Sequence, residues 1–252
     1  MADLTEITEF LDDYLGVAGA PDYPGAWNGL QVACRSPIEK VCTSPDAARA
    51  TIESAAGAGA QMLLVHHGLF WENPLPVTGS AYRRLRALFD ADMALYSVHL
   101  PLDLHPAIGN NVLLAGALGL PVEGRFGTVA EVEGIGVWSA TDLSLRELSQ
   151  RIEEVCGDPP HVIAGGPEHV RRVGLVTGGG ASLIRQAHAE GLDTFITGEG
   201  GHHSHHLALE LGLNVLYAGH YATETMGIRA LGELVAERFD VEAEFLDVPT
   251  GL

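Results

Sequence analysis

Short apolar runs alternate with longer amphipathic stretches along most of this chain, and this alternation is the strongest constraint on its fold. Short apolar runs are typical of buried strands, and apolar residues repeated every three to four positions are typical of helices. Together they predict an α/β protein. Strands are expected at 41–45, 62–67, 93–100, 134–139, 171–177, 193–198 and 213–218. Helices are expected at 4–15, 80–90, 107–118, 143–155, 181–190, 202–211 and 221–237. A further helix is expected after residue 45, ending at about residue 58.

Two features of local sequence refine this pattern. Ser44 or Asp46 is a suitable cap for the alanine-rich helix that ends near residue 58. The glycine-containing segment EGRFGT, residues 123–128, is the best candidate for a boundary between two lobes. The 252 residues are 46% hydrophobic, which is enough for one large domain or two compact lobes.

The charge balance argues against a polyanionic partner. The chain has 33 Asp and Glu residues against 14 Lys and Arg residues, a formal net charge of -19, and Lys40 is its only lysine. No basic cluster is longer than an arginine pair. The charge therefore argues against nucleic acid as the main partner, because the field of the protein would repel a polyanion unless a local basic patch overrode it, whereas divalent cations would be attracted.

The N-terminal segment and the cysteines indicate the cellular compartment. The first residues, MADLTEITEFLDDYLG, are acidic and have no apolar core, unlike a signal peptide. No apolar run is long enough to span a membrane. Cys34, Cys42 and Cys156 lack CxxC spacing, so neither a disulfide framework nor a zinc-thiolate site is indicated. We expect a cytoplasmic protein that does not bind a membrane.

Residues with reactive side chains follow apolar runs at four places: LLVHH, LYSVHLPLD, FITGE and LYAGH. Ligands of α/β proteins bind beyond the carboxyl ends of the strands, where the loops converge. Four such ends carrying His, Asp or Glu predict one shared cleft.

His66 and His67 end the first of these runs. Neighbouring side chains of a strand point to opposite sides, so two adjacent histidines suit two metal ions better than one. The alternative is a surface loop with two solvated histidines.

The segment SVHLPLDLHP, residues 97–106, contains His99, Asp103 and His105. Asp103 is a candidate ligand for a hard or borderline divalent ion, or else a cap for the helix that begins near Pro106. His99 is a candidate for substrate contact, for proton transfer or for supporting a ligand.

The segment GHYATET, residues 219–225, places His220 four residues before Glu224. On a helix these side chains share a face, and a glutamate can bridge two metals through its two oxygens. The same spacing is also common on solvated helices.

Two further segments have ambiguous patterns. TGEGGHHSHH, residues 197–206, has the highest density of histidines and is either a metal site or a solvated turn that binds abundant metal. VTGGGAS, residues 176–182, could hold a phosphate on its backbone amides, but it lacks the spacing of known phosphate loops. A tight turn explains its glycines better.

Four motifs lie in a fixed order between residues 66 and 231: HHGLFW, HLPLDLHPAIGNN, TGEGGHHSHH and AGHYATETMGIRAL. Together they resemble the NIF-three-like family, also called GTP cyclohydrolase type 2 homologues. The resemblance implies a two-lobed α/β fold, each lobe a sheet flanked by helices, with the C-terminal helix returning to the first lobe. We therefore expect one lobe from 1–125 plus 218–252 and another from 126–217. It also implies a homohexamer and a dinuclear metal centre. The family's ligand positions fall on His66, His67, Asp103, His220 and Glu224.

Such a centre suggests two functions of different kinds. The first is a metal-dependent hydrolase acting on a nucleotide or related heterocycle, with His99 as the candidate catalytic residue for proton transfer or substrate orientation. The alternative is a non-catalytic metal-handling or regulatory scaffold. Three imidazoles and two carboxylates suit two divalent ions of zinc, iron or manganese better than magnesium.

Overall fold

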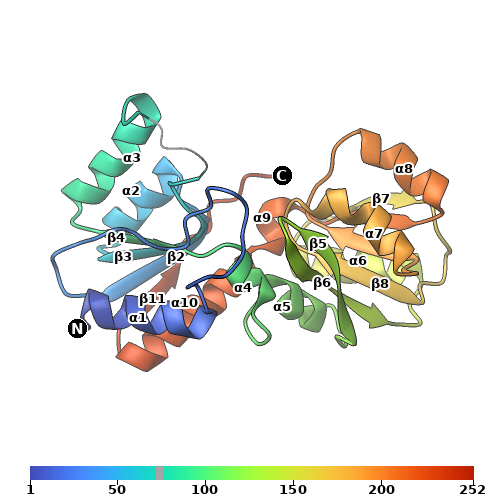
Figure 1. Cartoon of the computed structure of the whole chain (residues 1–252), viewed down its shortest axis with the longest axis horizontal. Helices are drawn as coiled ribbons and strands as arrows, with labels where there is room; N and C mark the ends of the chain where they lie inside the picture. Colours follow the sequence, from blue (N-terminus) through green and yellow to red (C-terminus); the bar gives the residue numbers. More distant parts are fainter. Residues whose placement is uncertain (72–75) are drawn as a thin grey trace. The chain divides into compact units, whose positions relative to one another are not determined.

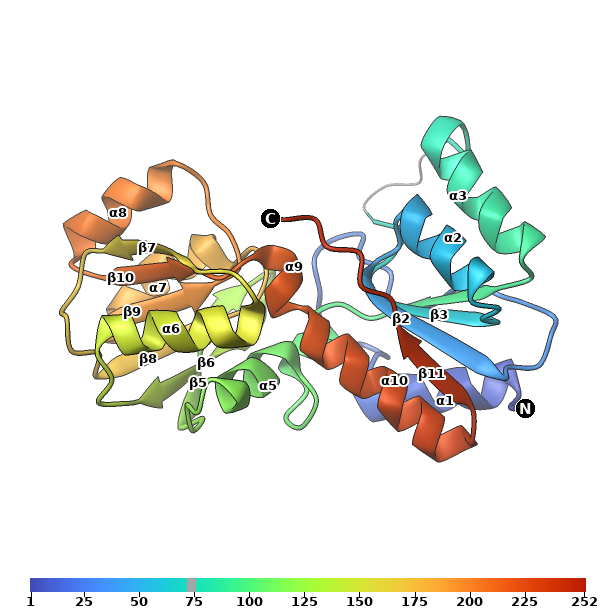
Figure 2. The same ribbon diagram turned by 180° about the vertical axis from the view of Figure 1, so that it is seen from behind.

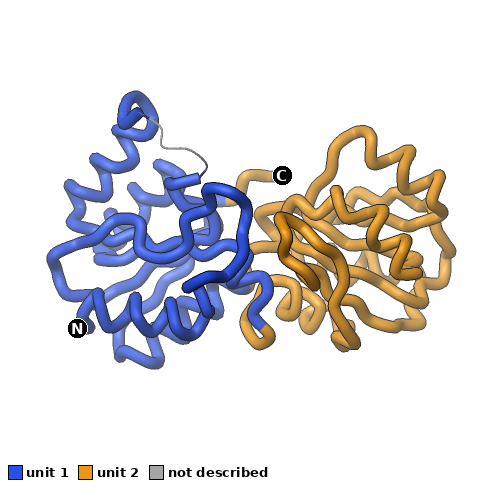
Figure 3. The backbone as a smooth tube through the Cα atoms, in the orientation of Figure 1, with its two compact units in different colours: residues 1–105, 227–248 blue, residues 106–226, 249–252 orange. Residues whose placement is uncertain are grey.

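The computed structural model describes residues 1–71 and 76–252, which form two compact units. Unit 1 comprises residues 1–105 and 227–248, and unit 2 comprises residues 106–226 and 249–252 (Figure 3). Each unit has its own sheet with helices on it, which confirms the predicted two-lobed α/β fold (Figure 1).

Unit 1 is built on a five-stranded sheet in the order β1-β4-β3-β2-β11. These strands are β1 (Gly29–Val32), β2 (Lys40–Asp46), β3 (Met62–His67), β4 (Ala94–Ser97) and β11 (Glu242–Phe245). All neighbours are parallel except β1 and β4, which are antiparallel. The carboxyl ends of β2, β3 and β4 therefore lie at one edge of the sheet. The middle strands are buried on both faces, which explains their continuous apolar sequences.

Helices cover both faces of this sheet (Figures 1 and 2). They are α1 (Leu4–Leu15), α2 (Arg49–Gly57), α3 (Gly79–Asp90), the short α4 (Leu100–Leu104) and α10 (Thr225–Phe239). Ile52 of α2 and Leu88 of α3 pack with Leu63 and Leu95 of the strands in one fully buried core. On the other face, Gly232 allows α10 to approach β2 closely, because a Cβ there would collide with the side chain of Thr43.

Unit 2 contains a six-stranded sheet in the order β5-β6-β8-β9-β10-β7. Its strands are β5 (Gly124–Val129), β6 (Val132–Ala140), β7 (His161–Ala164), β8 (Arg172–Val176), β9 (Thr194–Thr197) and β10 (Asn214–Tyr217). The three strands β8, β9 and β10 are parallel to one another. Their carboxyl ends lead into the glycine-rich segment, the Glu199 segment and the His220 segment.

The helices of unit 2 also lie on both faces of its sheet, α5 and α6 on one and α7 and α8 on the other (Figures 1 and 2). They are α5 (Asn110–Ala117), α6 (Leu145–Cys156), the 3-10 turn η1 (Gly180–Leu183), α7 (Ile184–Ala189), α8 (His203–Leu211) and α9 (His220–Thr223). Leu114 of α5 and Leu148 of α6 pack against Val173 and Leu175 of β8.

The division into units differs from the limits that we expected. Residues 106–125 and 218–226 belong to unit 2, because α5 contributes Leu114, Ala115 and Leu118 to the core of that unit. The segment EGRFGT is not a linker, since it forms most of strand β5, which pairs with β6.

Three local predictions were wrong at their ends. The helix α2 begins after Ala48 without a side-chain cap, so neither Ser44 nor Asp46 caps it. The strand expected at 93–100 ends at Ser97, because α4 begins at Leu100 with a proline in its first turn. The helix expected at 221–237 is interrupted at Glu224, which separates α9 from α10. Within the described residues, none of the helices combines the length and apolar character that a membrane span requires.

Candidate metal centre

Three histidines of unit 1 meet beyond the carboxyl ends of β3 and β4. His66 and His67 are the last residues of β3. Val65 of β3 is paired with Ser97, the last residue of β4, and His99 lies two residues beyond Ser97. One ring nitrogen from each histidine lies within 4.8 Å of the others. His66 is fully buried and His99 is only 8% exposed, so this is not the solvated loop of the alternative interpretation.

Each of these histidines is held by its Nδ1 atom. The Nδ1 of His66 lies 2.9 Å from the carbonyl oxygen of Val98. The Nδ1 of His67 lies 2.9 Å from the carboxylate of Asp46, and the Nδ1 of His99 lies 2.8 Å from that of Asp22. All three partners are acceptors, so Nδ1 donates the hydrogen, and in the neutral imidazole the lone pair is then on Nε2. This is the arrangement that supports histidine ligands in metal proteins.

Asp103 completes the unit 1 cluster, which we define as His66, His67, His99 and Asp103. It lies in α4, is 5% exposed, and its Oδ2 is 3.4 Å from the Nε2 of His66. The carboxylate of Asp103 and an unprotonated Nε2 of His66 are both acceptors, so their approach is favourable only when a cation or a proton lies between them. The donor set therefore fits a divalent transition metal. Asp103 does not cap α5, which begins after Gly109.

In unit 2, His220 and Glu224 form a second pair of candidate ligands. His220 begins α9 and Glu224 ends it, and the Nε2 of His220 lies 3.1 Å from Oε2 of Glu224. The Nδ1 of His220 lies 3.0 Å from Oε1 of Glu199. Glu224 is 4% exposed. The hydrogen bond with Glu224, against the opposing effect of burial and with help from Glu199, raises the pKa of His220 to about 9. Without metal, His220 thus holds a proton between two carboxylates where a cation would fit.

The glycine-rich segment 176–182 makes room for this pair. Gly178 has φ of +65°, and a Cβ at this position would collide with the carboxylate of Glu224. Its backbone amide donates to the hydroxyl of Thr223 over 3.0 Å. The close approach of α9 therefore explains why residue 178 is a glycine. The segment leaves space for the candidate ligand Glu224 and holds α9 in place.

Sequence reasoning missed the residues that orient the histidines. Asp22 had no assigned role, Asp46 was considered only as a helix cap, and Glu199, at the end of the run FITGE, had no assigned partner. Asp46 could have been found, because it ends β2 opposite His67 in the parallel register. Asp22 lies in a loop 77 residues before His99, and no spacing rule connects the two.

Aromatic side chains flank His99. The ring centroid of Trp71 is 4.7 Å from that of His99 and 6.1 Å from that of His67. The ring of Tyr23 lies 5.8 Å from His99. Burial, together with the charges of Asp22 and Asp103, raises the pKa of Tyr23, so its phenol stays protonated near neutral pH. These rings offer apolar surface for a planar group beside the cluster.

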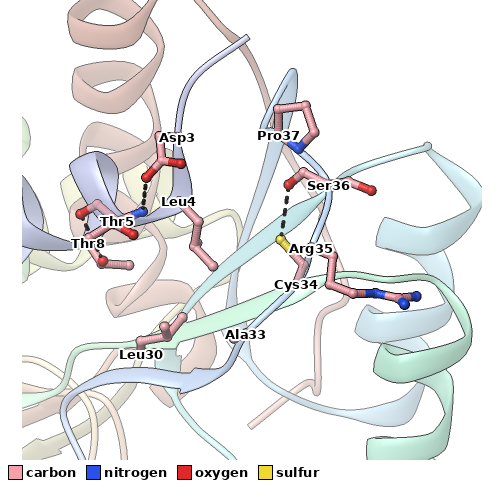
Figure 4. A pocket seen from close by; sticks show the side chains of 10 residues that line it. All are labelled: Asp3, Leu4, Thr5, Thr8, Leu30, Ala33, Cys34, Arg35, Ser36 and Pro37. Carbon is pink, nitrogen blue, oxygen red and sulfur yellow. Dashed lines mark hydrogen bonds between the residues drawn. The ribbon is translucent and has the colours of Figure 1, made fainter.

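A separate pocket of about 520 Å³ lies in unit 1, between the start of α1 and the segment that follows β1 (Figure 4). None of the predicted ligands lines it. Its Cys34 thiol donates to the carbonyl oxygen of Ser36 over 3.4 Å. Burial and the charge of Asp92 raise the pKa of this thiol, so it is a poor nucleophile.

Comparison with known proteins identifies the relatives of this chain. The family described as Duf34/NIF3 (NGG1p interacting factor 3) matches residues 2–251. The chain belongs to the DUF34/NIF3 family. The predicted family resemblance is therefore confirmed.

Curated relatives carry the name GTP cyclohydrolase 1 type 2 homolog. The protein from Deinococcus radiodurans is 41% identical over 248 residues, covering 98% of this chain and 94% of that protein. The protein from Escherichia coli is 41% identical over 249 residues, covering 97% and 98% respectively.

Solved structures of the family have the same fold. The protein ybgI, described as of unknown function, superposes with a TM-score of 0.91 at 39% identity, covering 98% of this chain and 99% of ybgI. A protein from Thermus thermophilus has a TM-score of 0.90 at 41% identity, covering 99% and 100%. Reduced HcgD from Methanocaldococcus jannaschii has a TM-score of 0.85 at 28% identity, covering 97% of each chain.

Proposed function

We propose that this protein binds two divalent metal ions through His66, His67, Asp103, His220 and Glu224, and that it is a metal-dependent hydrolase. The observation that carries the proposal is the common anchoring of the histidines. Each one fixes its Nδ1 on a carbonyl or carboxylate oxygen, so that Nε2 is the atom that would bind metal. Such pre-orientation is expected of a metal site, because ligands that are already ordered lose little entropy on binding.

Two of the proposed carboxylate ligands stand near the points where the chain passes from one unit to the other. The chain leaves unit 1 after residue 105, two residues beyond Asp103. It returns to unit 1 after residue 226, two residues beyond Glu224. Both carboxylates are thus close in sequence to a covalent connection between the units. We assign Glu224 as the bridging ligand, because its buried carboxylate offers two oxygens.

When bound by these residues, two cations would supply charge that lowers the pKa of a water and polarises an oxygen of the substrate. The protein's own contribution centres on His99. Burial raises the pKa of Asp22, but the hydrogen bonds from His99, Asn28 and the backbone of Tyr23, with the charge attraction of His99, together lower it by more, so Asp22 stays a carboxylate. It holds the Nδ1–H of His99, whose Nε2 can accept a proton or orient a substrate.

The substrate class that we propose is a nucleotide or a related heterocycle. Trp71 and Tyr23 flank His99 with aromatic surface on which a planar ring could stack. The names of the curated relatives point to a GTP cyclohydrolase type 2 reaction. A smaller nucleotide-like substrate is equally open, because the chain has a single lysine and no phosphate loop for a triphosphate. The cytoplasmic location and the homohexamer stay predictions.

The test is metal content with a matched control. Inductively coupled plasma mass spectrometry of gently purified, tag-free protein should find two metals per chain, of zinc, iron or manganese. Glu224→Ala should lose both, whereas Glu233→Ala, at a glutamate of α10 outside the proposed ligand set, should keep them. Two metals retained in Glu224→Ala would refute the bridge, and no metal in the wild type would refute the site.

Hydrolysis is tested on the metal-loaded protein. Purine ring opening is followed by the change in ultraviolet absorbance of GTP and of smaller purine nucleotides. His99→Ala should keep both metals and lose turnover. An absence of turnover with two metals bound would favour the alternative function, a metal-handling or regulatory scaffold, which the exposed histidines at the start of α8 also favour.

A further inference from the structure

The start of α8 carries histidines that the proposed centre does not use. His202, His203, His205 and His206 are all exposed. The ring centroids of His202 and His206 are 6.0 Å apart, and those of His205 and His206 are 5.5 Å apart. His202 and His206, four positions apart, share a helical face, and the ring of His205 lies beside that of His206.

The backbone beneath these rings is fixed to the sheet. Ser204 is 2% exposed, and its hydroxyl donates to the carbonyl oxygen of Gly201. The same hydroxyl is hydrogen-bonded to that of Tyr217 at the end of β10. Ala208, one turn later, is fully buried. The histidines therefore project into solvent from an anchored helical turn.

The spacing of the rings is close to that of metal-bound imidazoles. With a metal–nitrogen distance of about 2.0–2.1 Å and tetrahedral angles, the centroids of two imidazole ligands lie roughly 5 Å apart. The observed separations exceed this by about 1 Å or less. Exposed side chains cover that difference by small rotations about χ1 and χ2.

We propose that His202, His205 and His206 form an additional, exchangeable site for a borderline divalent cation such as Zn²⁺, Ni²⁺ or Cu²⁺. Imidazole nitrogen suits these ions, and the net charge of -19 raises their concentration near the surface. The positive end of the α8 dipole and the exposure of the rings weaken the site. We therefore expect fast exchange and lower affinity than at a buried centre. The site shares no ligand with the proposed dinuclear centre.

The matched control is His203. It belongs to the same turn, but its ring lies over the preceding backbone, since a Cβ at Gly201 would be 3.0 Å from its Cε1. His203→Ala and His206→Ala thus each remove one imidazole from the same exposed turn. His206 belongs to the proposed ligand set, and His203 does not.

The experiment is calorimetric titration of the protein, with its tightly bound metal in place, by Zn²⁺. The wild type should bind one further zinc per chain, reversibly and without competition from millimolar-range Mg²⁺. His206→Ala should weaken this binding by more than about tenfold, because even supporting residues of metal sites typically contribute that much. His203→Ala should change it by less than about twofold, as surface substitutions do.

Two further measurements decide the assignment. In Glu224→Ala the exchangeable zinc should still bind, so failure of the dinuclear centre would leave this inference standing. With Cu²⁺ as the probe, electron paramagnetic resonance should show coupling to imidazole nitrogen that His206→Ala reduces. Wild-type zinc binding in His206→Ala, or its loss in His203→Ala, would overturn the proposal.

Discussion

Two groups of histidines in this protein differ in what surrounds them. The start of α8 has four histidines within residues 202–206, whereas the unit 1 cluster draws three from β3 and the end of β4. The first group is exposed and stands on one helical turn. The second is largely buried, and each of its rings is fixed through Nδ1. We therefore expect burial and anchoring, and not histidine density in the sequence, to identify the tighter metal site.

The physical reason is the cost of ordering. An exposed imidazole loses side-chain entropy when it binds an ion, and its lone pair is shared with water until then. A buried imidazole that already donates from Nδ1 has lost that freedom during folding. Metal at the unit 1 cluster should consequently be tight and coupled to stability, and metal on α8 should be exchangeable and uncoupled from stability.

The largest effect that this comparison predicts is that of His66→Ala. The substitution removes a proposed ligand and leaves the buried carbonyl of Val98 without its donor. We expect lower occupancy of the tight centre, and the free energy of unfolding should fall by about 1–3 kcal/mol from the lost hydrogen bond alone. Metal analysis and urea denaturation measure the two effects. His206→Ala serves as the control, and similar losses in both variants would abolish the distinction between the groups.

A smaller effect is expected from Asp46→Ala, which removes the acceptor of His67 while keeping every proposed ligand. The affinity for the tight metal should fall by about 10–100-fold, as at other residues that orient histidine ligands. Competition with a chelator of known affinity measures this change. Asp90→Ala, at an exposed carboxylate paired with Arg86, should leave the affinity unaltered. Equal affinities in the two variants would show that anchoring is not what makes the unit 1 cluster bind.

The smallest effect is expected from replacing His202, His205 and His206 together with alanine. Because all three are exposed, the free energy of unfolding should stay within about 0.5 kcal/mol of the wild type. The tight metal content should not change. Urea denaturation and metal analysis are again the measurements, and a marked loss of either quantity would mean that α8 contributes to the buried centre.

Much of the fold was predictable because local periodicity follows from burial. The helix at 4–15 and the strand at 62–67 begin and end where the pattern indicated. Strands β1, β5, β7 and β11 were not predicted. Each lies at an edge of its sheet, where exposure weakens the apolar signal.

The candidate site was predictable in part. His66, His67 and His99 follow apolar runs, and parallel strands bring such positions to one edge of a sheet. Asp22 could not be paired with His99 from sequence, because the contact depends on a loop conformation without periodicity. The role of Gly178 was also hidden, since its positive φ serves a contact with α9, which lies more than 40 residues later in the chain.

By itself, the sequence determined the α/β class and the family and supplied the proposed metal ligands, because these depend on residue types in local patterns. Only the tertiary structure decided which histidines are anchored, which carboxylates orient them, and to which unit α5 belongs. These properties arise from contacts between residues far apart in the chain. Hydrogen bonding and packing select such contacts from many alternatives that local sequence leaves equally open.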